Sequence, residues 1–343
     1  MGSGREIIAA ICKTTPWGTA TACGALDGIL ILREAIKGGP AYEPDDSLQT
    51  WPKQGDLGAK TYQGDITANM RYRGLGLFLA MAMGTAGTPA QQGGTTAWLH
   101  TLQLATKTDG IFATLAIDKG HSVWEYASCK IAGFTLRGEA GKPVELIAHV
   151  ICSDLARNTS AGTNNNTTMA SVTIPDTQRR ALFRQGVFRI NSQSGAAIDD
   201  DDIIYPNKFE FVFKRKLSMD HVAGSDVIQE PLDDGNPEIN LKIGFPKYTA
   251  DTYLDALVDE TYQKMDIKFT GALISGAYYY GLNFYFPNLK CINAEAAVDG
   301  AGKIIHPLEF DCLGCDAAPT GMTSLTVPFK AELQNLLTTD ILA

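Results

Sequence analysis

Short runs that alternate between apolar and polar residues dominate this sequence, and most of them are separated by Gly, Asn or Asp. The runs are rich in Thr, Val, Ile, Tyr and Phe, which suit a pleated, half-buried strand. The pattern therefore predicts a mostly β fold with short helices. The predicted strands cover residues 64–72, 99–106, 127–138, 144–152, 208–217, 238–245, 264–271, 278–286 and 304–312.

Two segments depart from this pattern and predict helices. Residues 74–83 are almost wholly apolar, so we expect this short helix to be buried on several sides. Residues 249–260 are amphipathic. Their apolar positions at helical spacing are Tyr253, Leu254, Leu257 and Val258.

The two halves of the chain share one order of predicted elements. In each half a strand leads into a helix, then a further strand, and then two strands joined by a Gly-Lys turn of the tight hairpin kind. The matched positions are Lys130 and Lys290, Lys142 and Lys303, and Cys152 and Cys312, which are 160, 161 and 160 residues apart. This spacing favours two copies of one unit, at residues 1–195 and 205–343, although sparse identity leaves coincidence as the alternative.

Composition limits the class of protein. With 45% hydrophobic residues in a chain of 343, most of the sequence can bury a core, and the length predicts two domains or one large one. The longest apolar runs are well short of the ~20 residues that span a bilayer, and no secretory signal pattern opens the chain. A net charge of −9 argues against a protein that coats nucleic acid, but it permits one past which DNA slides.

No set of residues has the spacing that catalysis or a cofactor requires. Cys312 and Cys315 have metal or redox spacing, but a second cysteine pair or a histidine pair is missing. Lys303 follows a Gly-rich turn without the Ser or Thr that a phosphate-binding loop needs next. Residues 199–202 are consecutive Asp and lack the alternating ligands of a calcium loop. We therefore expect no enzyme, no cofactor and no metal.

Short phrases spread over nearly the whole chain carry a family resemblance. They are residues 13–20 (KTTPWGTA), 64–66 (GDI), the apolar helix that ends at Met83-Gly84, and residues 125–130 (EYASCK), 228–231 (IQEP) and 317–322 (AAPTGM). In these phrases and in its layout, the sequence resembles the tail tube (major tail) proteins of siphophages, of a type with two tandem domains.

The resemblance implies two tandem β-sandwich or barrel units, each flanked by an α-helix, that assemble into stacked rings around a DNA channel. Two units in one chain imply trimeric rings with pseudo-six-fold symmetry, with a hexamer of larger subunits as the fallback. The implied partners are further copies of the chain, a tape measure protein, a tail terminator, and DNA that passes without specific binding; no membrane is involved. The implied location is the virion tail, after synthesis in the host cytoplasm.

The resemblance also suggests roles for particular residues. Residues 36–60 best match the long loop that reaches a neighbouring ring, and its contact candidates are Tyr42, Trp51 and Lys53. The acidic candidates that face the channel are Glu139 and Asp299, where negative charge would repel phosphate; the alternative is an acidic surface that only keeps the subunit soluble. The candidates for disulfides between subunits are Cys12, Cys23, Cys312 and Cys315, with buried reduced thiols as the alternative.

Two other functions stay open at this point. The chain can be another tail or head-completion protein built on the same β-rich unit. It can also be a carbohydrate-binding β-sandwich module in which Trp51, Trp98, Trp124 and residues 278–280 (YYY) stack on sugars. Three consecutive tyrosines on a strand point to alternate faces, which suits a flat binding platform poorly.

Overall fold

The computed structural model describes residues 8–47, 51, 54–85, 88–158, 166–175, 179–298 and 300–342. Its strands are β1 (Ala9–Lys13), β2 (Gly28–Ile29), β3 (Arg33–Glu34), β4 (Lys37–Pro44), β5 (Gly55–Asn69), β6 (Ala90–Gln91), β7 (Trp98–Gln103), β8 (Ala113–Asp118), β9 (Val123–Glu139), β10 (Glu145–Cys152), β11 (Leu155–Asn158), β12 (Gly186–Ser192), β13 (Ile203–Ile204), β14 (Lys208–Lys214), β15 (Glu238–Phe245), β16 (Tyr262–Ser275), β17 (Tyr278–Asn293), β18 (His306–Cys312) and β19 (Lys330–Asn335). Its helices are α1 (Gly76–Met83) and α2 (Thr252–Val258), with short 3-10 turns η1 (Met169–Ser171), η2 (Phe183–Gln185) and η3 (Asp200–Asp202). All nine predicted strands are confirmed, and the predicted mostly β class is confirmed with them.

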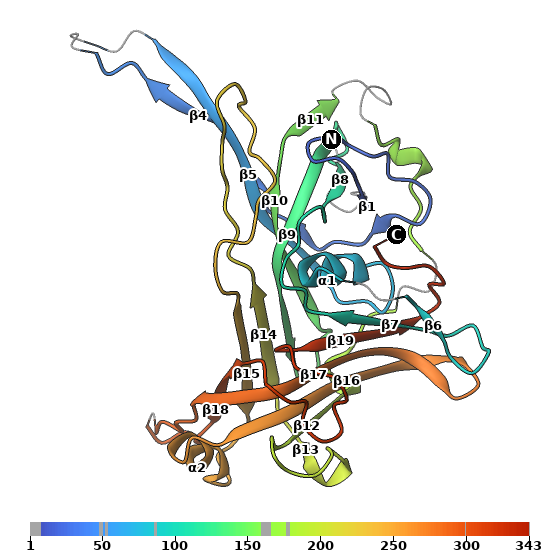
Figure 1. Ribbon diagram of the computed structural model, residues 1–343, viewed down its shortest axis with the longest axis vertical. Helices are drawn as coiled ribbons and strands as arrows, with labels where there is room; N and C mark the ends of the chain where they lie inside the picture. The colour runs from blue at the N-terminus through green and yellow to red at the C-terminus, as the bar shows by residue number, and fades with distance from the viewer. Residues whose placement is uncertain are drawn as a thin grey trace.

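One antiparallel path runs through most of the long strands. Its order is β5, β10, β9, β14, β15, β18, β17, β16 and β12. Figure 1 shows that β16, β17 and β18 run across the direction of β9, β10 and β14, so the sheet bends sharply along this path. The C-terminal strand β19 pairs with both β17 and β7, and it thereby joins the two halves of the chain.

The two halves of the path have the same strand order. In the first half β10 pairs with β5 and β9, and β9 pairs with β8; in the second half β18 pairs with β15 and β17, and β17 pairs with β16. The register also agrees, because Lys130 lies opposite Ile151 and Lys290 lies opposite Asp311. Before the boundary expected between residues 195 and 205, however, β12 already pairs with β16 of the second half.

A single aromatic-rich core joins these elements. Phe211 of β14 contacts Phe134 of β9, Phe286 of β17 and Phe329, with ring centroids 5.0–5.7 Å apart. These rings come from both halves of the chain, and all are at most 1% exposed. Burial of such rings supplies the main driving force for folding, so the halves are stabilised as one body.

The two predicted helices are confirmed, with one correction. Seven of the eight residues of α1 are buried, as its apolar composition predicts, and Gly84 ends the helix in the left-handed conformation (φ 86°). In α2, Tyr253, Leu254 and Leu257 pack against the core as expected, whereas Val258 is 72% exposed. Val258 is the last residue of α2 and lies off the face that packs against the core, so its apolar character does not indicate burial. None of the described helices has the length and apolar character that crossing a lipid bilayer requires.

Two expectations about connections are wrong. The turn at residues 300–303 does not join hairpin strands tightly, because β17 ends at Asn293 and β18 begins at His306. The turn at Lys142 does join β9 and β10 closely, as predicted. The segment at residues 36–60 is not a loop, because most of it pairs as the two strands β4 and β5.

We expect the stability of the subunit to fall at acidic pH partly through His100. Its imidazole is fully buried on β7, and burial lowers its pKa below the ordinary value of 6.5, although Nε2 lies 2.9 Å from the Leu337 carbonyl oxygen. The folded protein thus binds fewer protons than the unfolded chain as pH falls below 6.5, and stability is lost there. His100→Gln should reduce the difference between urea midpoints at pH 7.5 and pH 5.0. His121→Gln, at an exposed site, should leave this difference between urea midpoints unchanged. An equal pH dependence in the His100 variant and the original protein would contradict the assignment to His100.

Candidate assembly surfaces

Strands β4 and β5 form a hairpin arm that projects from the body of the molecule (Figure 1). Tyr42 and Leu57 are cross-strand partners on this arm and are 66% and 72% exposed, and Trp51 near its tip is 76% exposed. Lys53, the third predicted contact residue, lies outside the described residues. Exposed large apolar side chains at the end of a projecting hairpin are typical of a surface that another protein covers.

The base of the arm is braced by residues 215–237, the long connection from β14 to β15, which we call the brace. Figure 1 shows this connection running beside β5. The Lys60 backbone N–H donates to the Asp226 carbonyl oxygen at 2.7 Å, and the Lys60 ammonium lies 2.8 Å from the Asp226 carboxylate. His221 Nε2 lies 3.1 Å from the Lys60 carbonyl oxygen. These contacts set the direction in which the arm leaves the body.

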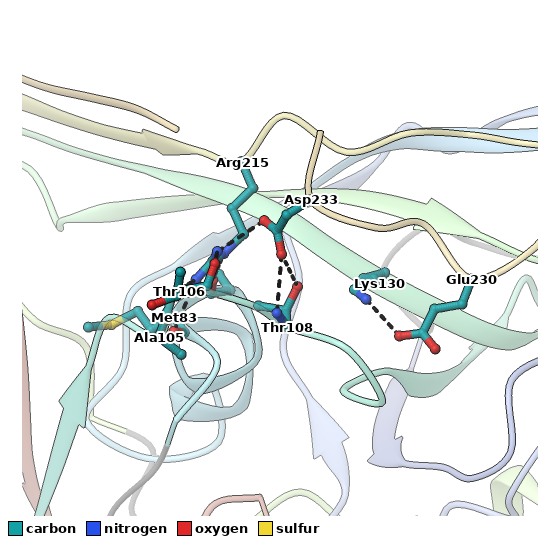
Figure 2. Close-up of polar contacts among 9 residues, drawn as sticks. Met83, Ala105, Thr106, Thr108, Lys130, Arg215, Glu230 and Asp233 are labelled. Carbon is teal, nitrogen blue, oxygen red and sulfur yellow. Dashed lines mark hydrogen bonds and ion pairs between the residues drawn. The ribbon is translucent and has the colours of Figure 1, made fainter. Parts of the chain in front are cut away.

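A buried arginine anchors the brace where it begins (Figure 2). Arg215 Nε donates to the Ala82 carbonyl oxygen at 2.8 Å, and Nη2 donates to the carbonyl oxygens of Met83 (3.2 Å) and Ala105 (2.6 Å). Two of these carbonyls belong to the last turn of α1, where a cation is favoured by the unsatisfied carbonyl groups. The guanidinium therefore ties the start of the brace to the first helix.

The same arginine is paired with a carboxylate from the other end of the brace. Arg215 Nη1 lies 3.0 Å from Asp233, whose second oxygen accepts from the Thr108 backbone N–H at 3.2 Å. A second buried cation, Lys130 on β9, lies 2.7 Å from Glu230 and is 1% exposed. Buried cations are tolerated only when paired and hydrogen-bonded, so both ends of the brace are held by specific partners.

Sequence patterns did not predict these anchors. Arg215 falls within the strand predicted at residues 208–217, but nothing in the sequence marked it as buried or paired with Asp233, and the role of Glu230 was not predicted either. The one available signal was that Arg215 continues the alternate positions of Phe209, Phe211 and Phe213 in β14, which are all buried. The position was thus compatible with burial, but its partners lie far away in sequence.

The sheet face opposite the aromatic core carries a row of alternating charges across five strands. In strand order the neighbours are Glu145, Arg137, Glu210, Lys242 and Glu309. Arg137 contacts Glu145 at 3.1 Å and Lys242 contacts Glu309 at 2.8 Å, and the hydrogen bond to Glu309 raises the pKa of Lys242. The row borders a hollow of ≈ 480 Å³. This face is charged but nearly balanced, rather than uniformly acidic.

Of the two acidic residues expected to face a channel, the structure describes one. Glu139 ends β9 at the margin of this hollow, and its carboxylate lies 2.6 Å from the Lys142 ammonium. The hydrogen bond from Lys142 lowers the pKa of Glu139, so this carboxylate stays ionised and is offset by a neighbouring cation. Asp299 lies outside the described residues.

The four candidate cysteines fall into two places. Cys12 and Cys23 bring their sulfurs within 2.8 Å of each other. Cys312 is 4% exposed at the end of β18, while Cys315 is half-buried and its thiol donates to the Leu325 carbonyl oxygen at 3.5 Å. In the part of the chain that the structure describes, the one group of three candidate metal-ligating side chains is Cys12, Cys23 and Asp27, so the Cys312/Cys315 pair gains no further ligand.

The aromatic residues considered for sugar binding lie on separate elements. Trp51 is on the arm, Trp98 begins β7 and Trp124 is on β9. Tyr279 is 45% exposed whereas Tyr280 is 4% exposed, so the tyrosine run divides between the two faces of β17 as alternation predicts.

Comparison with known proteins identifies the family. A solved structure entitled "Crystal structure of Hcp protein" matches 37% of this chain and 86% of its own chain, at 10% identity and a TM-score of 0.25, which is too low to define a shared fold. No curated protein sequence matches the chain. The model of the phage tail tube protein family matches residues 4–312. Because that match spans most of the 343 residues, the chain belongs to the phage tail tube protein family and is a structural protein of the tail tube.

Proposed function

We propose that this tail tube protein builds each ring of the tube from three subunits, each of which contributes two copies of one ring-forming unit, at about residues 1–195 and 205–343. The observation that carries the proposal is the matching strand order and register of β5, β10, β9 and β8 with β15, β18, β17 and β16. Two like units in one chain present six like positions around a three-subunit ring. A ring of six subunits is the alternative.

In a closed ring, the strands at the ends of the sheet path would pair with those of neighbouring subunits. An edge strand presents unpaired backbone groups that invite pairing with another chain, and closing a barrel removes such edges. We place the charged face, with its row from Glu145 to Glu309, toward the channel, because the opposite face is filled by the aromatic core. Alternating charges there leave no continuous basic track for phosphates, so DNA passes without specific binding.

The arm is the element that links one ring to the next in this proposal. It projects beyond the body of the subunit, and it carries Tyr42 and Trp51 in exposed positions, with Lys53 nearby in sequence. Large aromatic side chains that become buried in a neighbour's surface supply much of the energy of protein association. The subunit is made in the host cytoplasm and ends in the virion tail, where a tape measure protein within the channel and a terminator at its end are its partners. Its role is mechanical and involves no catalytic step.

The ring proposal is tested by electron microscopy of concentrated protein or of phage tails. Averaged end-on views should show three-fold symmetry with six similar lobes around a central hole. Six-fold symmetry, with a subunit count of six per ring by native mass spectrometry, would overturn the three-subunit ring and leave the family assignment intact. Three-fold rings with lobes of two unlike shapes would overturn the two-copy interpretation alone.

A further inference from the structure

The N-terminal loop holds two thiols in close contact. Cys12 lies on β1, and the chain returns to it at Cys23 after a loop formed by residues 14–22. The two Sγ atoms are 2.8 Å apart. Inside the loop the Thr14 and Thr21 hydroxyls are 2.8 Å apart, and the Thr14 hydroxyl donates to the Thr19 carbonyl oxygen at 2.6 Å. The loop is thus already closed on itself by polar contacts beside the two sulfurs.

The separation of the sulfurs discriminates between two uses of such a pair. Two thiolates bound to one tetrahedral zinc ion at about 2.3 Å each lie about 3.8 Å apart. A disulfide places its sulfurs about 2.05 Å apart. The observed 2.8 Å lies between these two values and nearer to that of a disulfide, so the geometry favours a sulfur–sulfur bond over a shared zinc ion. The nearby Asp27 carboxylate already accepts from the Gly24 backbone N–H at 2.7 Å.

Access to solvent separates this pair from a second pair of cysteines. Cys12 is half-buried, whereas Cys23 behind it is 2% exposed. Cys129 and Cys152 are cross-strand partners on β9 and β10, and both are fully buried. An oxidant in solution therefore meets a thiol at the first pair and none at the second, which makes Cys129 and Cys152 an internal control.

We propose that Cys12 and Cys23 form a reversible disulfide within one subunit when the protein meets a low-molecular-weight disulfide such as oxidised glutathione. The Cys12 thiolate attacks one sulfur of glutathione disulfide and releases one glutathione thiolate, which leaves a mixed disulfide on Cys12. The Cys23 thiol then loses its proton to solvent and attacks Cys12 Sγ, and it releases the second glutathione thiolate. Two protein thiols are oxidised, one glutathione disulfide is reduced to two thiols, and the two protons end on the two glutathione molecules.

Each cysteine suits its part in this exchange. The hydrogen bond with Cys12 and, after it, burial raise the pKa of the Cys23 thiol, which leaves attack on the external disulfide to the more exposed Cys12. Cys23 is in contact with Cys12 and is therefore placed to resolve the mixed disulfide.

The disulfide would cross-link the two ends of a loop that contacts the brace. The Trp17 indole N–H, inside the loop, donates to the Ile228 carbonyl oxygen of the brace at 3.0 Å, and its ring packs edge-on against Phe112 with centroids 5.2 Å apart. The Gly18 backbone N–H donates to the Ser128 hydroxyl at 2.9 Å. A covalent link between Cys12 and Cys23 restricts the unfolded loop and so stabilises the contact between loop and brace.

The test uses the full-length protein incubated with oxidised or reduced glutathione, then alkylated with iodoacetamide and digested with trypsin. Cleavage after Lys13 separates the cysteines, so the disulfide should appear as peptide 6–13 linked to peptide 14–33, and it should vanish after reduction. Oxidation should raise the Tm by about 5 °C. Cys12→Ser and Cys23→Ser should abolish both the linked peptide and the Tm shift, whereas Cys315→Ser should keep both.

Four outcomes would overturn the proposal. The first is full alkylation of peptides 6–13 and 14–33 after oxidation of a protein with native circular dichroism. The second is a link between two copies of peptide 6–13, which would indicate a bond between subunits. The third is a link between Cys129 and Cys152 in place of the expected one. Finally, one equivalent of zinc per chain, lost in Cys12→Ser, would assign the pair to a metal.

Discussion

Replacing Arg215 with Ala should lower the free energy of unfolding of the subunit by about 3–5 kcal/mol. The substitution leaves Asp233 with its charge largely buried and without its cationic partner, and it removes the donors that the carbonyl groups of Ala82, Met83 and Ala105 now share. Breaking a buried ion pair from one side costs more than the pair contributes, because the remaining charge is desolvated and uncompensated. The urea midpoint of the isolated subunit, followed by tryptophan fluorescence, measures the effect.

The neighbouring lysine provides a matched control. Lys214 is the exposed last residue of β14, so Lys214→Ala should change the free energy of unfolding by no more than about 0.5 kcal/mol. Arg215→Lys keeps the charge but loses the fork of donors, so its stability should fall between that of Arg215→Ala and that of the original protein. Equal urea midpoints for the Ala variants at positions 214 and 215 would show that the buried guanidinium does not hold the brace.

Removal of the arm should prevent tube formation without unfolding the subunit. Deleting residues 42–57 and joining Ala41 to Gly58 through an Asn-Gly turn shortens the hairpin but keeps Lys60 and its contacts with the brace. The deleted side chains Tyr42 and Leu57 are mostly exposed, so the core loses almost nothing. If the arm links rings, the variant should give isolated rings or free subunits in electron micrographs where the original protein gives tubes.

A point variant at the arm tip makes the same test without a deletion. Trp51 is 76% exposed in the free subunit, and a tryptophan at the centre of an interface commonly contributes about 2 kcal/mol or more. Trp51→Ala should therefore raise the protein concentration needed for tube assembly about 30-fold. Leu313→Ala, at a partly exposed apolar position away from the arm, should leave assembly unchanged. Tubes of normal length from the arm-deleted subunit would show that the arm does not link one ring to the next.

The sequence pattern predicted an element correctly wherever the residues of that one strand or helix are enough to decide which side chains are buried. The alternation at residues 238–245 predicts β15 at its observed bounds, because each side chain of a strand points to the face opposite its neighbour's. The apolar stretch of α1 likewise predicts burial on several sides. Val258 was assigned wrongly because helical spacing places a residue on a face but does not say where the partner surface ends.

The candidate site was only partly visible in the sequence. The arm segment and its aromatic residues were found, but its hairpin pairing was not, because Gly and Pro in residues 36–60 mask the strand pattern. Arg215 and Asp233 were missed for a different reason. Arg215 bonds to Ala82 and Ala105, which are more than 100 positions away, and no local pattern encodes such a contact.

The sequence by itself determined the mostly β class, the positions of the long strands, the buried first helix and, through the family match, the structural role in a phage tail tube. These follow from side-chain period and turn composition, which act over a few residues at a time. Only the tertiary structure decided that β19 joins β7 to β17, that two buried cations hold the brace, and that Cys12 meets Cys23 rather than any other thiol. Each of these depends on which distant surfaces bury one another, and that choice is made by the packing of the whole core.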